Sequence, residues 1–132
     1  MAGLVVVDTD LLVYFLRGRG EGVQLVRSLL RRKRLRVTSI TAFELRRGSD
    51  FLHRRDDIMR LVRRRTFPLD ARSALLAGEV SASLRGSGND FGTADCLQAG
   101  VCLRHDLPLA TRNRKHFERV PGLHLADLEA EA

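Results

Sequence analysis

The chain has 132 residues, of which 44% are hydrophobic and 30% are charged. This balance is typical of one globular domain and excludes a disordered, collagen-like or disulfide-dense chain. No apolar run approaches the roughly 20 residues that a membrane-spanning helix needs, and Asp8 interrupts the first apolar run before it could act as a signal peptide. We therefore expect a single domain over residues 1–132 that is soluble, cytoplasmic and has no membrane partner.

Positive charge is concentrated in the first half of the sequence. Residues 1–70 carry a net charge of +8, whereas residues 71–132 carry −1. Basic clusters attract polyanions, and nucleic acid is the first candidate. A solvated helix face or a docking surface for an acidic partner also fits, and the excess of 21 Arg over 2 Lys also fits a biased genomic base composition. The charge alone leaves these interpretations open.

The first half of the chain alternates between strand-like and helix-like segments. Leu4–Val7 is a short, wholly apolar run, which is typical of a strand buried on both faces. The apolar periodicity that follows predicts a helix over 9–17 that Gly18 ends, a helix over 21–34, a strand over 35–40, and helices over 41–48 and 53–65.

The second half continues the alternation. We predict a brief extended piece over 67–69, a helix over 70–85 that Asp70 caps, a helix over 92–103, a strand over 107–111 and an edge strand over 123–125. Strands separated by helices predict a parallel sheet that helices cover, which is an α/β fold. Cys96 and Cys102 lie six residues apart on one predicted helix and point to different sides, so we expect two reduced thiols.

Acidic and amide side chains follow the predicted strands where ligands bind in such sheets. Asp8 ends the first strand, and Glu44 lies in the first turn of the helix after the second strand. Asp95 lies in the first turn of the helix over 92–103, and Asn113 follows the strand over 107–111. We therefore expect their oxygen atoms to converge on one edge of the sheet.

Each acid also has a purely structural explanation. Asp8 can cap the first helix, Glu44 can form a capping box with Thr41, and Asp95 can interact with the dipole of its helix. None of these roles requires the carboxylates to lie close together. Two bare charges about 4 Å apart repel by roughly 4 kcal/mol at an effective dielectric constant near 20, and a bound divalent cation removes that repulsion.

The donor types select the metal ion. The candidate ligands are oxygens of Asp, Glu and an amide, and the four histidines are scattered rather than spaced as in a zinc site. Such a set favours Mg²⁺ or Mn²⁺. A hard cation can lower the pKa of a bound water and stabilise a leaving oxygen at phosphorus. Acids for a metal beside arginines for a phosphate backbone are what a phosphodiesterase needs.

Four sequence blocks occur in an order that resembles a known family. They resemble the PIN-domain ribonucleases and, more narrowly, the VapC toxins of bacterial toxin–antitoxin pairs, over about Leu4 to Leu125. The blocks are Val5-Val6-Val7-Asp8-Thr9-Asp10-Leu11-Leu12, then Thr38 to Gly48, then Gly92 to Gly100, then Leu109 to Phe117.

The resemblance implies a three-layer α/β/α sandwich with a central parallel sheet. It also implies a Mg²⁺- or Mn²⁺-dependent endoribonuclease that acts on RNA, forms a homodimer and is blocked by the tail of a cognate antitoxin protein. The family's acidic metal site falls on Asp8, Glu44 and Asp95, and its fourth acidic position falls on Asn113, which supplies no charge. Further roles follow for Thr9 and Thr111, which would support the acids by hydrogen bonds, and for Arg46, Arg47 and Arg112, which we expect to hold the RNA backbone.

Two other interpretations remain open at this point. Asp8-Thr9-Asp10 after an apolar strand resembles the nucleophile and acid pair of haloacid-dehalogenase-like phosphatases, although Leu12 stands where that family has Thr or Val. A catalytically weakened RNA-binding or partner-binding domain of the same fold is the other alternative, and Asn113 is the residue that suggests it. The role of Asp10, in the site or on the surface, also remains open.

Overall fold

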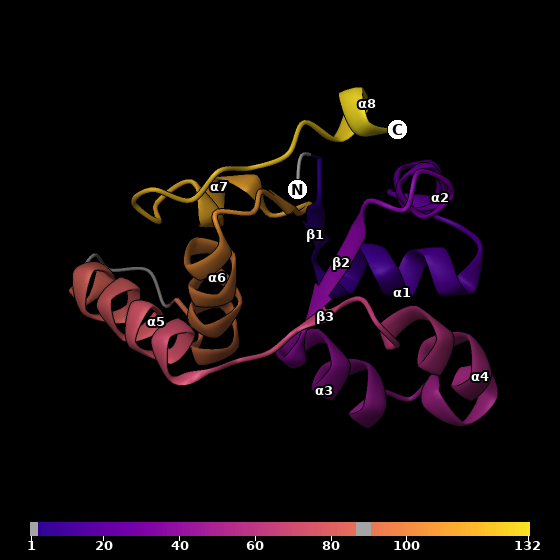
Figure 1. Cartoon of the computed structure of the whole chain (residues 1–132), viewed down its shortest axis with the longest axis horizontal. Helices are drawn as coiled ribbons and strands as arrows, with labels where there is room; N and C mark the ends of the chain where they lie inside the picture. The colour runs from indigo at the N-terminus through magenta and orange to yellow at the C-terminus, as the bar shows by residue number, and fades with distance from the viewer. Residues whose placement is uncertain (1–2, 87–90) are drawn as a thin grey trace.

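The computed structural model describes residues 3–86 and 91–132. Strands and helices alternate along this part of the chain (Figure 1). In order, the elements are β1 (Val5–Val7), α1 (Thr9–Arg17), α2 (Val23–Arg31), β2 (Leu35–Thr38), α3 (Ser39–Arg47), α4 (Phe51–Val62), β3 (Thr66–Phe67), α5 (Ala71–Leu84), α6 (Thr93–His105), β4 (Leu109–Ala110), α7 (Arg114–Phe117) and α8 (Leu128–Glu131).

The four strands form one parallel sheet in the order β3-β2-β1-β4. Val6 of β1 is in register with Arg36 of β2 on one side and with Leu109 of β4 on the other. All three residues of β1 are buried, which is expected of a strand that is covered on both faces. The predicted parallel sheet is therefore confirmed.

Helices cover both faces of the sheet, and alternate residues of β1 point into different cores. Val5 and Val7 belong to a cluster with apolar residues of α1, α2 and α4. Leu4 and Val6 belong to a second cluster with residues of α5, α6 and α7. Figure 1 shows these two groups of helices on opposite sides of the strands. The predicted α/β/α sandwich is confirmed.

Helices α5 and α6 approach each other closely at Gly100. A Cβ atom on Gly100 of α6 would lie only 2.8 Å from the Cβ of Ala77 and 2.9 Å from its backbone nitrogen, and it would also meet the carbonyl oxygen of Ser73. The absence of a side chain at this position therefore lets α6 approach the backbone of α5.

Several helix boundaries differ from the prediction for identifiable reasons. Helix α2 ends at Arg31, and Lys33 adopts a left-handed backbone with φ 59° that no helix continues. Helix α3 begins at Ser39, because the Thr38 hydroxyl accepts a hydrogen bond of 3.2 Å from the Thr41 N–H. Thr38 is thus the N-cap, and the alternative of a capping box starting at Thr41 is wrong.

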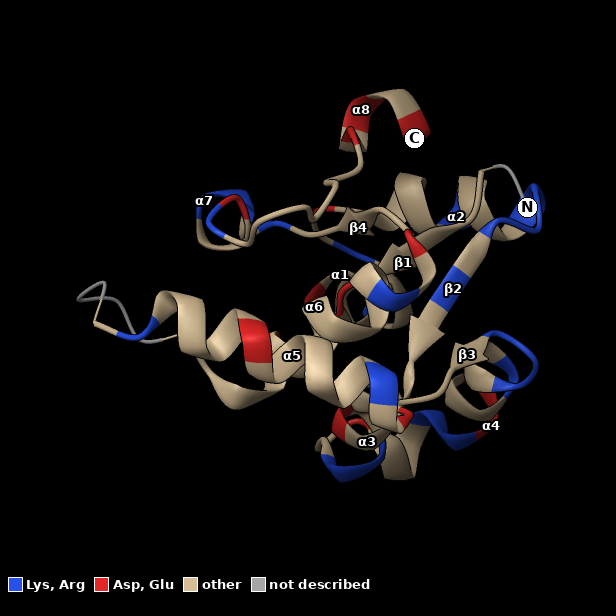
Figure 2. Cartoon of the chain, turned by 60° about the vertical axis from the view of Figure 1, so that its left-hand side comes forward, with Lys and Arg blue, Asp and Glu red and all other residues tan. Residues whose placement is uncertain are grey.

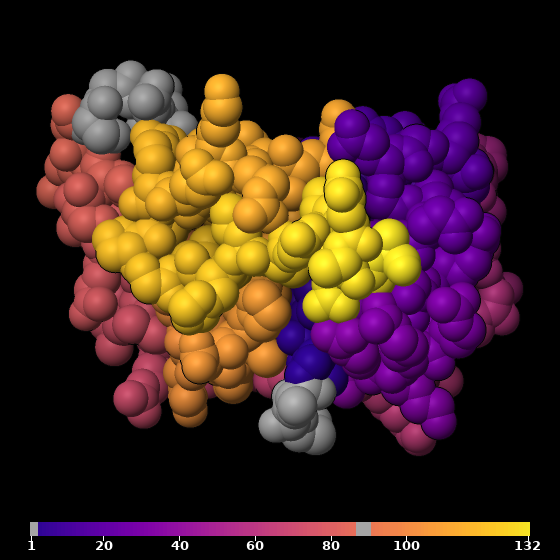
Figure 3. Space-filling model, turned by 90° about the horizontal axis from the view of Figure 1, so that it is seen from above, coloured from indigo at the N-terminus to yellow at the C-terminus, as the bar shows by residue number. Residues whose placement is uncertain are grey.

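The C-terminal part departs most from the prediction. The expected strand over 123–125 is reduced to a single parallel bridge between Leu109 and Leu125, and the short helices α7 and α8 were not predicted. The C-terminal residues cross from one half of the molecule to the other (Figure 3). There Glu131 pairs with Arg34 at 2.9 Å and with Arg32 at 3.6 Å.

Two further predictions concern the cysteines and membrane-spanning helices. Cys96 and Cys102 are buried and free, as predicted. In the described part of the chain, no helix combines the length and the hydrophobicity needed to cross a membrane.

Candidate active site

The site lies at the carboxyl ends of β1 and β4, where the strand order of the sheet reverses. From β1 the chain runs outward through β2 to β3 and then returns to β4 on the other side of β1. Ligands of open α/β sheets bind beyond the carboxyl ends of the strands at such a reversal. Asp8 directly follows β1, and Thr111 directly follows β4. The topology therefore brings together two polar residues that lie far apart in the sequence.

Asp8 is held at both carboxylate oxygens. As the N-cap of α1, its Oδ1 accepts a hydrogen bond of 2.9 Å from the Thr9 N–H. Its Oδ2 accepts one of 2.8 Å from the Thr111 hydroxyl. Burial raises the pKa of Asp8 from 3.8 to about 6, the two hydrogen bonds oppose this, and the nearby carboxylates of Asp10 and Asp95 add to it. The capping role is real, but it explains neither the burial nor the acidic neighbours.

Thr9 connects Asp8 to the second acid. While its N–H donates to Asp8, its hydroxyl donates a hydrogen bond of 2.7 Å to Oε1 of Glu44. Glu44 lies 35 residues further along the chain, on α3. The predicted supporting role of Thr9 thus has a defined geometry, because one residue orients both carboxylates.

A chain of hydrogen bonds from α3 and α6 fixes the hydroxyl of Thr9. A carboxylate oxygen only accepts, so the single Thr9 hydroxyl proton goes to Glu44 and the bond of 2.9 Å between Thr9 and Thr41 must be donated by Thr41. Thr41 in turn accepts from the side-chain amide of Gln98 at 3.3 Å. The hydroxyl of Thr38 donates to the carbonyl oxygen of the same amide. Each donor in this buried chain therefore has a defined direction.

The third acid, Asp95, is hydrogen-bonded to a histidine side chain. Its Oδ2 lies 2.9 Å from Nε2 of His116. Arg119 can only donate, and its guanidinium lies 3.1 Å from Nδ1 of the same ring, so Nδ1 accepts and the proton on Nε2 is donated to Asp95. The ring of Phe91 stacks on His116 with 4.1 Å between ring centroids and an angle of 7°. These contacts fix the ring that orients Asp95.

The two remaining polar candidates lie at the surface. Asn113 is exposed, and only its backbone N–H joins the network, with a hydrogen bond of 3.1 Å to the Thr111 hydroxyl. Asp10 is also exposed in the first turn of α1, although its charge still acts on Asp8. Asp8 and Glu44 are linked through Thr9, and Asp95 acts on Asp8 through its charge, whereas the side chain of Asn113 is left available to a ligand.

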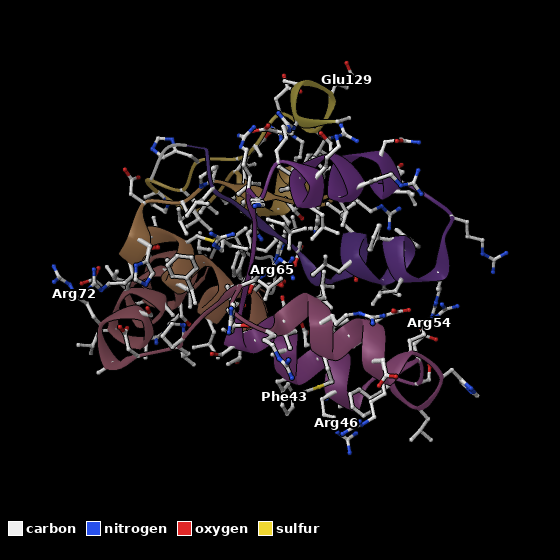
Figure 4. All side chains as sticks on the ribbon, turned by 45° about the vertical axis from the view of Figure 1, so that its right-hand side comes forward. Phe43, Arg46, Arg54, Arg65, Arg72 and Glu129 are labelled. Atoms are coloured by element: carbon white, nitrogen blue, oxygen red, sulfur yellow. The ribbon has the colours of Figure 1, made fainter. Side chains whose placement is uncertain are left out.

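The three predicted RNA-binding arginines differ in their surroundings. Arg46 and Arg47 are exposed on α3, and each covers a phenylalanine ring, with 4.3 Å from Arg46 to Phe51 and 5.7 Å from Arg47 to Phe43. Figure 4 shows Arg46 and Phe43 pointing away from the body of the protein.

Arg112 is engaged within the protein. It pairs with Glu21 at 3.2 Å and donates a hydrogen bond of 2.7 Å to the hydroxyl of Tyr14. Arg46 and Arg47 are consequently better placed to meet a phosphate.

The donor set suits a hard cation, but the carboxylates are not yet arranged around one. Every candidate ligand is an oxygen, and the pKa of Asp8 is raised mainly by burial, with a smaller contribution from the charges of Asp10 and Asp95. Among the residues that the structure describes, no three acidic, histidine or cysteine side chains converge on one point in a way that could hold a metal ion. Glu44 is turned to Thr9 and Asp95 to His116. The three-carboxylate metal site stays a prediction.

Sequence reasoning missed the residues that support the acids. Thr38, Thr41 and Gln98 are buried polar side chains, and His116 lies on the unpredicted α7. A signal was present for Gln98, since it is a polar residue amid the apolar ones of a helix. No signal in the sequence marks His116, because its role depends on how α7 folds back against the start of α6.

The chain is similar to known proteins over nearly its whole length. The PIN domain family model matches residues 5–123. The tRNA(fMet)-specific endonuclease VapC of Salmonella typhimurium is 26% identical over 126 residues, which cover 92% of this chain and 95% of that protein.

Two solved structures share the fold over nearly the whole chain. VapBC2 from Rickettsia felis, bound to a DNA fragment from its promoter, has a TM-score of 0.76 with 23% identity and covers 93% of this chain and 97% of its own. DNA-bound VapBC from Salmonella typhimurium has a TM-score of 0.75 with 22% identity and covers 95% and 98%.

Proposed function

The chain belongs to the PIN domain family, and from this premise we propose that it is a metal-dependent endoribonuclease. The observation that carries the proposal is Asp8, a half-buried carboxylate at the sheet reversal whose pKa is raised to about 6, near the carboxylates of Asp10 and Asp95. A carboxyl group with a raised pKa at a ligand-binding edge is typical of a catalytic site. The endonuclease name of the relative from Salmonella typhimurium supports the same reaction class.

The residues divide the work between holding a cation and holding RNA. Asp8, Glu44 and Asp95 would hold Mg²⁺ or Mn²⁺, which supplies positive charge against the phosphate and an activated water when bound. Thr111 and Thr9 keep the Asp8 carboxylate oriented through hydrogen bonds to both of its oxygens. Preorganised donors of this kind avoid reorganisation during the reaction.

RNA would be held at the rim of this site. Arg46 and Arg47 are exposed on the same helix as Glu44, so their guanidinium groups can meet phosphates next to the scissile bond. The exposed amide of Asn113 can donate to a phosphate oxygen or to a cation-bound water without adding charge. A site with one fewer carboxylate needs less cation charge for its neutralisation.

We further propose that the protein is the toxin of a toxin–antitoxin pair. The two solved structures are VapBC assemblies, and their fold is shared over more than nine-tenths of this chain. An antitoxin protein that covers the acidic edge would block access of RNA, and a homodimer is the expected assembly.

The phosphatase alternative has no support in the geometry. A nucleophile and acid pair requires Asp10 to point at the same substrate atom as Asp8, but Asp10 is exposed in the first turn of α1. The family match over residues 5–123 also concerns a different fold family.

A cleavage assay tests the proposal. The purified chain is incubated with unfractionated tRNA in Mg²⁺ or Mn²⁺, with EDTA as the metal-free control, and compared with Asp8→Asn and Asp95→Asn. We expect cation-dependent cleavage by the wild type and a loss of about 100-fold or more in each variant. Cleavage that survives both substitutions, or that proceeds in EDTA, would refute the proposed site.

A further inference from the structure

A second basic surface lies away from the acidic edge. Six cationic side chains line one depression of about 500 Å³, here called the basic depression; they are Lys33, Arg36, Arg60, Arg63, Arg64 and Arg65. They come from the turn before β2, from β2 itself, from the end of α4 and from the segment before β3. Figure 2 shows the blue of Lys and Arg running along these segments.

The basic depression occupies the opposite end of the strands from the acids. Lys33 precedes β2 by two residues and Arg65 directly precedes β3, whereas Asp8 and Thr111 follow the carboxyl ends of β1 and β4. At about 3.3 Å per residue, the four residues of β2 put roughly 10 Å or more between the two sites. The depression is therefore not the rim of the catalytic site.

The charges in the basic depression are largely uncompensated within the protein. Arg60 has a carboxylate partner, Asp57, but in residues 3–86 and 91–132 none of the other five cations lies within 4.0 Å of one. Arg36 and Arg65 instead donate to backbone carbonyls near their own turns, which orients their guanidinium groups. Like charges gathered without partners repel one another unless an anion binds between them.

Two of the six residues that line the basic depression also have a strained backbone conformation. Lys33 has φ 59° and Arg64 has φ 63°, and both lie in the left-handed region that glycine adopts more easily. Among the described residues, three non-glycine residues have positive φ, and two of them are these cations. These two positions therefore carry long basic side chains where glycine would be less strained, which points to a use for the charge.

We infer that the basic depression binds the phosphate backbone of the RNA at a distance from the scissile bond. This inference rests on the proposed function for the identity of the polyanion. A structured RNA is broad enough to contact both ends of the sheet, whereas a short single strand in the acidic site is not. The second contact would favour folded RNA over short single strands without any readout of bases.

The test compares two triple variants of equal net charge in an Asp8→Asn background, so that binding is measured without cleavage. The first is Lys33→Gln/Arg63→Gln/Arg64→Gln, in the depression. The control is Arg27→Gln/Arg55→Gln/Arg72→Gln, three exposed arginines elsewhere. The probe is fluorescently labelled unfractionated tRNA, with the Kd measured from 50 to 300 mM NaCl, and thermal unfolding checks that both variants fold.

We expect the depression variant to bind tRNA about tenfold more weakly at 100 mM NaCl. The slope of log Kd against log salt concentration should fall by about two to three, because each lost phosphate contact releases about one counterion fewer. The control should change both quantities by less than half as much. Equal effects of the two variants would show that only overall charge matters and would overturn the inference.

Unchanged tRNA binding by the depression variant would also overturn the inference, in favour of an acidic protein as the occupant. Because the readout is binding by a protein that does not cleave, a failure of the proposed nuclease activity remains distinguishable from a failure of this second site.

Discussion

The Thr111 hydroxyl donates a hydrogen bond of 2.8 Å to Asp8 across 103 residues of sequence. The same hydroxyl accepts the backbone N–H of Asn113 at 3.1 Å. Thr111 thus uses its one proton on the acid and a lone pair on the loop that follows β4. This residue couples the carboxylate at the end of β1 to the loop that follows the neighbouring strand β4.

Removal of this hydroxyl should disturb Asp8 more than the fold. In Thr111→Val, Asp8 loses a hydrogen bond that lowers its pKa. We expect the acidic limb of the pH profile of kcat/KM to move to higher pH and the rate at pH 7 to fall about tenfold. Thr111→Ser keeps the hydroxyl and is the matched control. Profiles that coincide for Val and the wild type would contradict this role.

The raised pKa of Asp8 makes stability depend on pH. The folded protein binds a proton at Asp8 more tightly than the unfolded chain does, so stability is greatest below pH 4 for this group and declines between about pH 4 and pH 6. Above pH 6 the ionised carboxylate costs about 2–3 kcal/mol, with a pKa of about 6 against 3.8 in the unfolded chain.

Asp8→Asn should therefore stabilise the protein at neutral pH while it abolishes cleavage. Asparagine keeps an acceptor for the Thr9 N–H but carries no charge. In EDTA, urea unfolding should show a gain of about 1–3 kcal/mol at pH 7.5 and about a third of that gain at pH 4.5. An equal gain at both pH values would mean that the folded protein does not raise the pKa of Asp8.

Two glycines, Gly100 on α6 and Gly78 on α5, allow a matched comparison of the free energy of unfolding. Gly100→Ala would place a methyl group against the backbone of α5, and we expect a loss of about 1–3 kcal/mol. Gly78→Ala on α5 meets nothing within 4 Å and should gain about 0.5–1 kcal/mol through helix propensity. Urea unfolding measures both, and a neutral Gly100→Ala would contradict the close approach of α5 and α6.

His116 should affect cation binding through its hydrogen bond to Asp95. His116→Phe retains a ring to stack on Phe91 but removes the N–H that donates to the carboxylate. Hydrogen-bond partners of metal ligands typically contribute 10–100-fold in affinity, so we expect Mn²⁺ binding to weaken by about that factor. His116→Gln restores an N–H donor and should recover part of the loss. Binding by the Phe variant equal to that of the wild type would remove His116 from this role.

The sequence was most informative where local chemistry determines structure. The apolar run at β1 predicted a strand buried on both faces, and Asp70 predicted the start of α5, where its carboxylate accepts the Ser73 N–H at 2.8 Å. Asp8 was identified because it directly follows that first strand. Such features depend on a few neighbouring residues, and a single sequence records them.

What the sequence did not reveal depends on contacts between distant segments. The bond from Gln98 to Thr41 joins α6 to α3, and the ring of His116 reaches Asp95 from a helix of four residues. The α3 boundary was missed for a different, local reason, since both Thr38 and Thr41 can cap and the structure selects Thr38. Periodicity carries no information on which of two chemically equal residues is used.

Mn²⁺ binding, measured by isothermal titration calorimetry, tests the three-carboxylate metal site at the edge of the sheet. The wild type, Asp8→Asn, Glu44→Gln and Asp95→Asn are compared, with Asp57→Asn as an exposed acidic control on α4. We expect the wild type and the control to bind alike and each of the other three to lose at least about tenfold in affinity. Affinities that are the same in all five proteins would contradict this expectation.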